Sequence, residues 1–287
     1  PADEAAQGAA LLEWLADGEF VFIGYREYRL ADHDPDDGEQ HPERAVLEPV
    51  PGTGLGILRE DRPGAHPPRP TVLTGRVAQK ATEPRLLIIT KANSRSTVHR
   101  PLYLDYVGVK VFDDSGTVTG ERRFLGLFAS SAYSASVSHV PYVAEKVERV
   151  LDASGYPRNS HLGRDPREVL DTYPRDELCG TDVRRLTDSA LSGAQPHHPP
   201  RPRRFLRDDD YARYVSCLVY LPRDRYNTAV RHRMERLLLE AFDGASVEHS
   251  TRVSRSVLAM VHFVVRLPAG VPLPAVDLKA LERRLVD

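Results

Sequence analysis

The chain has 287 residues, of which 41% are apolar and 28% charged, and its formal net charge is −2. This length predicts one large domain or two smaller ones, and the apolar fraction is ample for a packed core. A net charge so close to zero argues against a general attraction to nucleic acid or to anionic membrane surfaces.

The sequence contains two cysteines, Cys179 and Cys217, which lie far apart and outside any metal-ligand spacing. Two isolated thiols favour a reducing, cytoplasmic setting over a disulfide framework. No signal-peptide pattern is present, and no apolar run is long enough to span a bilayer. The chain starts without a methionine and stops within an apparent helix at Val276–Val286, so we interpret it as a segment of a longer chain.

The first elements are a predicted helix and a predicted strand. Ala5–Ala16 carries leucines at helical spacing, and Phe20–Leu30 alternates as a strand does. Ala31–Arg44 is acidic and contains two histidines, His33 and His41, which invite a metal-site interpretation. Because no rigid element flanks them, we expect a solvated loop instead.

The stretch Gly52-Thr53-Gly54-Leu55-Gly56 invites a nucleotide-binding interpretation. A dinucleotide fingerprint needs a strand before its glycines and a helix after them. Here Pro49 and Pro51 interrupt the approach, and the prolines of Arg62–Pro70 prevent a helix. We therefore expect a turn into a short strand at Ile57-Leu58 and no cofactor site.

A long antiparallel hairpin is predicted in the middle of the chain. Tyr103–Phe112 is rich in aromatic and β-branched residues, Asp113–Gly116 has turn chemistry, and Gly120–Ala129 resumes as a second strand. Before the hairpin, Thr71–Ala78 is expected as a weak strand or loop and Leu86–Thr90 as a third strand of the same sheet.

The apolar face of that sheet needs a cover, and the helix that follows is the natural one. Its valines and leucine recur at helical spacing, Ser138 is the expected N-cap and Pro141 sits in the expected first turn. The stripe consists of Val140, Val143, Val147, Val150 and Leu151.

The connection into the hairpin carries the one candidate binding site, made of Asn93, Arg95, His99 and Arg100. Two arginines beside short polar side chains could hold a carboxylate or a phosphate. In the alternative interpretation, these groups cap strand ends and pair with acidic neighbours. His161 has no evident orienting acid or nucleophile, so we identify no catalytic residue. We also identify no metal site.

The second half of the chain predicts helices, a linker and a new sheet. Short helices are expected from Asp165 and over Asp182–Leu191, followed by a linker rich in proline and arginine at Gln195–Arg204. Tyr214–Leu221 is apolar on both faces and is expected as an interior strand.

A helix capped by Asn227 or Thr228 and ended by Gly244 comes next, followed by strands at Ser246–Thr251 and Ser256–Leu267 and a further helix from about Asp277. This order is that of a ferredoxin-like βαββ(αβ) unit. Its last strand would fall beyond Asp287, which predicts an open sheet edge.

Three stretches carry a family resemblance: NSRSTVHRPLYLDYVGVKVFDDSG, ERRFLGLFASSAYS and YVSCLVYLPRDRYNT. They resemble the N-terminal, non-catalytic region of the large bacterial NAD-specific glutamate dehydrogenases. The resemblance covers most of Leu11–Gly270 and implies an α+β chain. A PAS-like antiparallel sheet with helices would occupy 1–176, a helix and proline-rich linker 177–204, and a truncated ACT-like domain 205–287.

The resemblance also implies a function, that of a non-catalytic regulatory and oligomerisation segment. The full-length enzyme would convert glutamate to 2-oxoglutarate and ammonia with NAD, whereas the segment itself would hold no cofactor. Expected partners are a second copy of the chain and the catalytic domain of the same chain, with no nucleic acid and no membrane.

The alternative function is an amino-acid sensor. ACT modules often bind amino acids where two modules pair, commonly at a glycine between the first strand and first helix. Leu221–Asn227 has no glycine, which favours pairing over sensing. A stand-alone hydrolase or transferase is disfavoured, because no nucleophile turn such as G-x-S-x-G is present.

Overall fold

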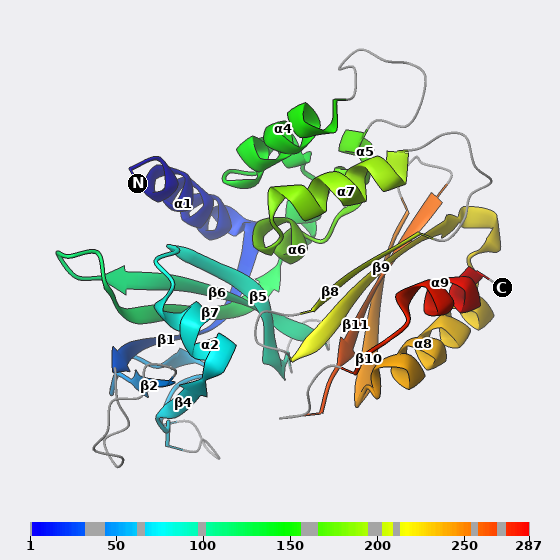
Figure 1. The fold of residues 1–287 in the computed structure, drawn as a ribbon. Coiled ribbons are helices and arrows are strands. Elements are labelled where there is room, and N and C mark those ends of the chain that lie inside the picture. The colour runs from blue at the N-terminus through cyan, green and yellow to red at the C-terminus, as the bar shows by residue number, and fades with distance from the viewer. Residues whose placement is uncertain are drawn as a thin grey trace. The chain divides into compact units, whose positions relative to one another are not determined.

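The computed structural model describes residues 2–31, 44–61, 67–96, 102–155, 166–194, 203–208, 213–253, 258–268 and 274–286. Two compact units are present (Figure 1). The first comprises Pro1–Ala135, His139–Tyr142 and Arg175–Gly180, and the second comprises Ser136–Ser138, Val143–Pro174 and Thr181–Asp287. The domain boundaries expected from the sequence, 1–176, 177–204 and 205–287, stay a prediction.

The first unit is built on a curled antiparallel sheet with the strand order β4-β2-β1-β7-β6-β5, and β3 pairs with β1 off this path. The chain is thus of mixed α+β class, as expected. The strands are β1 Phe20–Ala31, β2 Arg44–Pro49, β3 Leu55–Gly56, β4 Thr71–Thr74, β5 Leu87–Arg95, β6 Tyr103–Phe112 and β7 Val118–Phe128.

The predicted hairpin is confirmed as β6 and β7, which pair from Asp105–Gly126 at one end to Phe112–Val118 at the other. Asp113 shapes the turn, because its carboxylate Oδ1 accepts the backbone N–H groups of Ser115 and Thr117 at 2.9 Å each. The backbone φ of Gly116 is +83°, a left-handed conformation that glycine adopts at no steric cost.

The glycine-rich stretch forms a turn, but its strand lies two residues earlier than expected. The strand is β3, Leu55–Gly56, whereas Ile57-Leu58 form a turn. Gly56 has a φ of +59°, and a Cβ there would lie 2.0 Å from the carbonyl oxygen of Ile23. Glycine is therefore required for the close approach of β3 to β1.

The helices of the first unit are α1 Ala2–Trp14, α2 Gly75–Thr82, α3 Ser130–Ser134 and α6 Arg175–Gly180. The prediction of a weak strand or loop at Thr71–Ala78 is wrong in its second half. There the chain turns at Gly75, with a φ of +54°, and enters α2. α6 packs against β5, so it covers part of the sheet.

The second unit begins with a helical layer of α4 Val143–Ser154, α5 Pro166–Thr172 and α7 Val183–Ala194. The valine stripe is buried as predicted, but the helix begins at Val143 instead of after Ser138. Tyr142 has a φ of +65°, which interrupts the helical backbone before that point. α4 packs on α7 and α5 within this unit.

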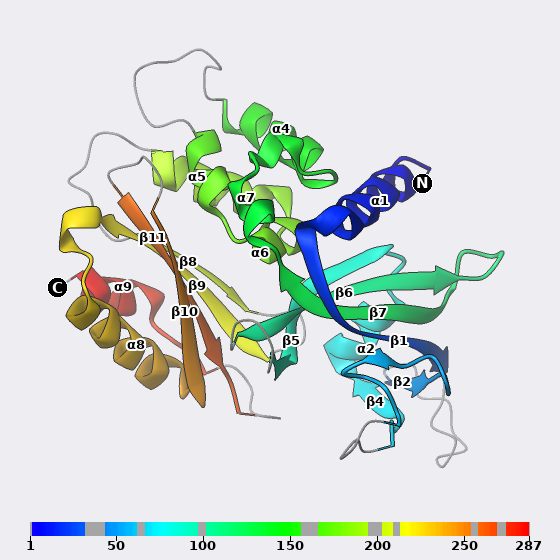
Figure 2. The ribbon, with the colours of Figure 1, turned by 180° about the vertical axis from the view of Figure 1, so that it is seen from behind.

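The remainder of the second unit is a four-stranded antiparallel sheet with the order β10-β11-β9-β8. The helices α8 and α9 cover one of its faces (Figures 1 and 2). The elements are β8 Arg203–Asp208, β9 Tyr214–Pro222, α8 Thr228–Phe242, β10 Ser246–Val253, β11 Leu258–Arg266 and α9 Leu278–Val286.

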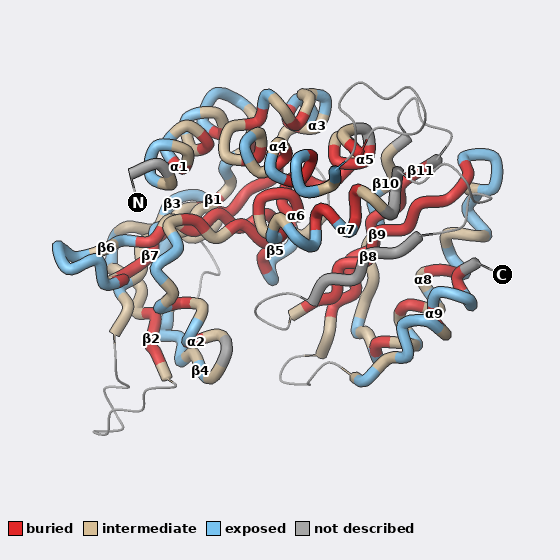
Figure 3. The backbone as a smooth tube through the Cα atoms, turned by 45° about the horizontal axis from the view of Figure 1, so that its top comes forward, coloured by how far each residue is buried: buried red, intermediate tan, exposed pale blue. Residues whose placement is uncertain are grey.

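The covered face holds the core of this module, and β9 is buried along its whole length, which confirms its interior position (Figure 3). Burial of about a dozen apolar side chains is the main force that holds the helices to the sheet. The fully enclosed set includes Val215, Cys217, Val219, Leu238, Val261, Phe263 and Val265.

The sequence predicts an open sheet edge beside β9, and this prediction is wrong, because β8 occupies that edge. β8 pairs antiparallel with β9 from Arg203–Tyr220 to Asp208–Val215. It therefore takes the place that the last strand of a ferredoxin-like unit would fill. The strand begins at Arg203, so the last two residues of the predicted linker Gln195–Arg204 belong to the sheet.

Replacement of the α8 N-cap is expected to destabilise the chain measurably. The Oδ1 atom of Asn227 accepts the N–H of Val230 at 2.9 Å. We expect Asn227→Ala to lower the free energy of unfolding by about 1 kcal/mol, and Asn227→Asp to retain most of it, because aspartate also caps. Urea denaturation of the three proteins checks this. Equal losses in both variants would contradict the role of the cap.

Candidate functional site

Two of the four predicted anion-site residues lie within the described chain. Asn93 and Arg95 are exposed and lie at the C-terminal end of β5. This strand continues to Arg95, whereas the sequence predicts that it ends at Thr90. The guanidinium of Arg95 lies 5.2 Å from the centre of the Tyr103 ring. His99 and Arg100 lie outside the described residues, so the four-residue anion site stays a prediction.

A buried cluster of charges lies close by, where α6 meets β5 and β6. The Lys91 ammonium forms a short ion pair with Asp105 and lies 3.5 Å from Oδ2 of Asp176. The side chain of Lys91 is 15% exposed, and each carboxylate is 2% exposed. Asp105 also accepts the backbone N–H of Phe128 at 3.2 Å, which joins the cluster to β7.

Burial and mutual attraction both shift the pKa values of Lys91 and Asp105. Burial raises the pKa of Asp105 to about 6, and the attraction of Lys91 opposes that shift. Burial alone would lower the pKa of Lys91, but the attraction of Asp105 and Asp176 holds it well above its usual value. A lysine that stays protonated is neither a nucleophile nor a base, so the cluster acts as a structural tie.

A second cluster lies on the sheet of the first unit. Tyr106 donates a short hydrogen bond to Glu121, and Arg123 Nε lies 3.2 Å from the same carboxylate. The Arg123 guanidinium also stacks 3.9 Å from the centre of the Tyr28 ring. These groups satisfy one another, so this arrangement holds strands together.

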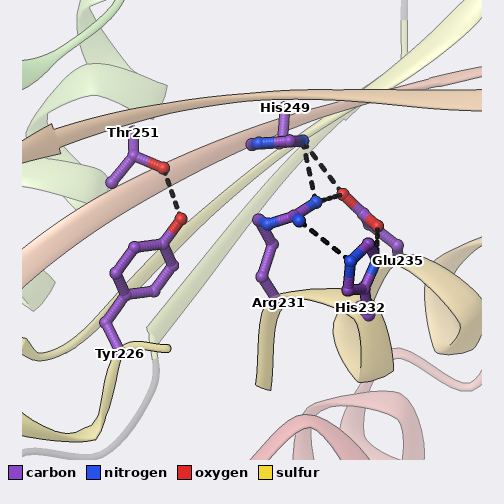
Figure 4. A network of polar contacts seen from close by, with 6 residues as sticks. All are labelled: Tyr226, Arg231, His232, Glu235, His249 and Thr251. Atoms are coloured by element: carbon purple, nitrogen blue, oxygen red, sulfur yellow. Dashed lines mark hydrogen bonds and ion pairs between the residues drawn. The ribbon is translucent and has the colours of Figure 1, made fainter. Parts of the chain in front are cut away.

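A third group of titratable side chains, partly exposed, lies on the ACT-like module between α8 and β10 (Figure 4). Glu235 on α8 is at its centre and is 14% exposed. Its Oε1 atom lies 2.5 Å from Arg231 Nη1 and 2.9 Å from His249 Nδ1, and its Oε2 atom lies 2.9 Å from His232 Nδ1. One carboxylate therefore binds three cationic or titratable neighbours.

The hydrogen bonds define the state of His232. Arg231 Nη2 lies 3.0 Å from His232 Nε2, and a guanidinium can only donate. His232 Nε2 is therefore the acceptor, and Nδ1–H donates to Glu235. This contact requires the neutral imidazole of His232. His249 Nδ1 lies 2.9 Å from Glu235 Oε1 and 3.4 Å from Arg231 Nη1, so it donates to the carboxylate in one tautomer and accepts from the guanidinium in the other.

A separate contact joins β10 to the loop immediately before α8. The hydroxyl of Tyr226 lies 2.7 Å from the hydroxyl of Thr251 on β10 (Figure 4). The contacts of Glu235 therefore hold α8 against β10, and the contact of Tyr226 holds the loop before α8 against the same strand. The His-x-x-Glu spacing of His232 and Glu235 is visible in the sequence, but His249 joins them only through the position of β10.

Removal of the Glu235 carboxylate is expected to weaken the contact between α8 and β10. We expect Glu235→Gln to lower the free energy of unfolding by about 1–2 kcal/mol, because charge-assisted hydrogen bonds become neutral ones in a mostly buried place. Guanidinium denaturation of the variant checks this. The control is Glu282→Gln on the exposed side of α9, for which no measurable change is expected. An unchanged Glu235→Gln protein would show that the contacts contribute nothing.

Within the described ranges, no group of three or more histidine, cysteine, aspartate or glutamate side chains is arranged to hold a metal ion. In that same part of the chain, every helix is too short or too polar to cross a membrane.

Comparisons with known proteins match both parts of the second unit. Residues 203–287 match the family model described as the glutamate dehydrogenase ACT2 domain. Residues 140–194 match the model described as glutamate dehydrogenase helical motif 1, in agreement with the helices found there.

Curated relatives extend the match over nearly the whole chain. NAD-specific glutamate dehydrogenases of Halomonas elongata, Pseudomonas aeruginosa and Mycobacterium tuberculosis are 35%, 38% and 34% identical to it. The alignments cover 100%, 93% and 95% of this chain but only 17%, 16% and 16% of those proteins.

The chain therefore spans about one sixth of the length of these relatives. The two domain models, the identities and the coverage of the chain agree with the resemblance carried by its strand and loop sequences. Over nearly its whole length the chain is therefore similar to one part of the large NAD-specific glutamate dehydrogenases, and within it lie matches to their ACT2 domain and to a helical motif.

Proposed function

We propose that this chain is a non-catalytic regulatory and assembly segment of a large NAD-dependent glutamate dehydrogenase. The whole enzyme would interconvert glutamate with 2-oxoglutarate and ammonia in the cytoplasm, with NAD bound by residues outside this segment. The names of the relatives and the small share of their length that this chain spans support the proposal.

The single observation that carries the proposal is the ACT-like module itself. Both of its helices, α8 and α9, pack on one face of its sheet. In the described part of the chain, β10 lies at one edge of that sheet. A module with this architecture, whose sheet ends at β10 within the described residues, is suited to association with another module. For the first unit we propose a PAS-like fold, which its curled antiparallel sheet supports.

The loop between β9 and α8 favours assembly over amino-acid sensing. Arg223–Arg225 form a single 3-10 turn, and Tyr226 packs against the module core and contacts Thr251. A large side chain therefore occupies the loop where the resemblance would place a glycine against a ligand. Sensing is the second candidate function, carried by the match to an ACT2 domain.

Turnover by this chain alone is the direct test. We expect the purified chain not to oxidise NADH in the presence of 2-oxoglutarate and ammonia, as followed by the absorbance of NADH. Measurable turnover that scales with protein concentration would overturn the non-catalytic assignment.

Sedimentation with and without glutamate separates the two candidates. We expect a self-associated species whose mass is the same in both conditions. A glutamate-dependent mass, or a rise in the melting midpoint with an amino acid, would favour sensing, because a ligand that binds the folded state stabilises it by mass action.

A further inference from the structure

Arg26, near the middle of β1, is a buried cation that has no acid beside it. The residue is 7% exposed, and its guanidinium donates a short hydrogen bond to the carbonyl oxygen of Leu58. Its Nε–H group is buried and has no hydrogen-bond acceptor among the described residues. Within those same ranges, no carboxylate forms an ion pair with it. Buried charges are normally paired, because an unpaired charge is costly to remove from water, so an anion beside Arg26 would be strongly favoured.

The neighbouring strand adds a second cation to the same place. β1 and β7 lie side by side in the sheet of the first unit (Figure 1). In their pairing Arg26 is directly opposite Arg123, and opposite residues of antiparallel strands point to the same face. Like charges in this position repel each other, which increases the cost of leaving Arg26 without an anion.

The acid that serves this face is turned toward the other neighbour of β7. Glu121 lies 3.2 Å from Arg123 Nε and accepts a short hydrogen bond from Tyr106 on β6. A Cβ on Gly108, also on β6, would lie 3.1 Å from the carboxyl carbon of Glu121. The carboxylate therefore reaches over β6, away from β1. It balances the charge of Arg123 and leaves that of Arg26 unbalanced.

Arg26 is covered by the glycine-rich turn around β3. A Cβ on Gly54 would lie 3.0 Å from Arg26 Nη2, so the backbone of this turn lies directly against the guanidinium. Gly54 and Leu58 are partly exposed, and Leu55 and Gly56 are exposed. The cover is thus a surface turn, which can admit a small solute without disturbing the pairing of β1 with β7.

We propose that Arg26 binds a small carboxylate, whose oxygens accept the Nε–H group and a second N–H group of the guanidinium. A guanidinium has five N–H groups in a planar fork that matches a carboxylate, and Leu58 takes one of them. A monoanion matches the single unbalanced charge, whereas a phosphate dianion needs more donors than this guanidinium has left. The site lies in the first unit and does not depend on the ACT-like module, which carries the proposed assembly function.

The test is thermal melting of the 287-residue chain at neutral pH, with sodium acetate compared with sodium chloride at equal ionic strength. Acetate is the probe because it carries a carboxylate and no amino group. We expect a saturable rise of the melting midpoint with acetate, since a ligand of the folded state stabilises it by mass action. Arg26→Gln is expected to raise the acetate dissociation constant at least about tenfold, because a charged donor is lost.

The matched control is Arg29→Gln, which removes an exposed arginine from the same strand and is expected to keep the wild-type response. Arg26→Lys keeps the charge without the fork and is expected to keep only part of it. An acetate response that is absent in the wild type, or equal in the wild type and Arg26→Gln, overturns the proposal.

Hydrogen exchange of the wild type gives a second measurement that needs no substitution at Arg26. Acetate is expected to slow exchange at residues 52–60, which cover the guanidinium, and to leave β10 and β11 unchanged. Unchanged exchange at 52–60 in saturating acetate overturns the proposal, whereas the sedimentation and NADH experiments measure the assembly role and the non-catalytic assignment independently.

Discussion

Replacement of Lys91 by methionine is expected to lower the free energy of unfolding by about 3–5 kcal/mol, because it leaves two carboxylates buried without their shared cation. Asp105 and Asp176 are each 2% exposed, so water cannot replace the ammonium without opening the contact between α6 and β5. Urea denaturation monitored by circular dichroism measures the loss.

The matched control is Arg59→Met, which removes the cation of an exposed ion pair with Asp61. Exposed pairs contribute little, so the control is expected to unfold as the wild type does. Comparable losses in the two variants would mean that burial of the Lys91 cluster does not govern its contribution.

The same cluster predicts how stability changes with pH. Burial raises the pKa of Asp105 to about 6, compared with about 4 in an unfolded chain. Between these values the folded chain binds this proton more tightly than the unfolded chain does. The stabilising contribution is therefore complete below about pH 4 and is lost as the pH rises through about 6.

Unfolding free energies between pH 4 and 7 test the assignment to Asp105. Asp105→Asn is expected to remove this part of the pH dependence, whereas Asp114→Asn in the exposed turn of the hairpin is expected to keep it. Persistence of the same slope in Asp105→Asn would assign it to another group.

Replacement of Arg175 by alanine is expected to lower the free energy of unfolding by at least about 3 kcal/mol, because several buried acceptors lose a charged donor at once. The Arg175 side chain is fully buried. Its guanidinium donates to the carbonyl oxygens of Ala132 and Ala135 at 2.8 Å each and lies 3.4 Å from that of Tyr133. One side chain thus holds the turn that follows β7.

Arg175→Lys separates charge from geometry. It keeps the positive charge but lacks the planar fork that reaches several carbonyls, so it is expected to recover only part of the loss. Hydrogen exchange is expected to accelerate first at residues 130–135 in both variants. Full stability of Arg175→Lys would show that charge alone suffices.

Local signals explain which elements the sequence could predict. The β6–β7 hairpin, α8 and β9 follow from alternation, turn residues and an asparagine cap, all of which act over a few neighbouring residues. α6 could not be found in this way. Its residues Arg175, Asp176 and Glu177 look like a solvated turn in the sequence, yet all three are buried.

The start of α4 and the candidate sites depend on contacts that local patterns do not contain. Nothing in the sequence around Tyr142 signals its positive φ, so the local pattern predicts a start of the helix that is too early. The Glu235 network needs the antiparallel position of β10 beside α8 before His249 can be counted in it. The predicted anion site could be placed only for Asn93 and Arg95.

The positions of the two cysteines have a practical consequence. Cys179 is buried in the first compact unit and Cys217 in the second, and neither forms a disulfide. A thiolate must reach solvent before an alkylating reagent can modify it, so each cysteine reacts only when its own surroundings open. Labelling followed by mass spectrometry of the two cysteine peptides therefore reports the opening of each unit separately, without any introduced probe.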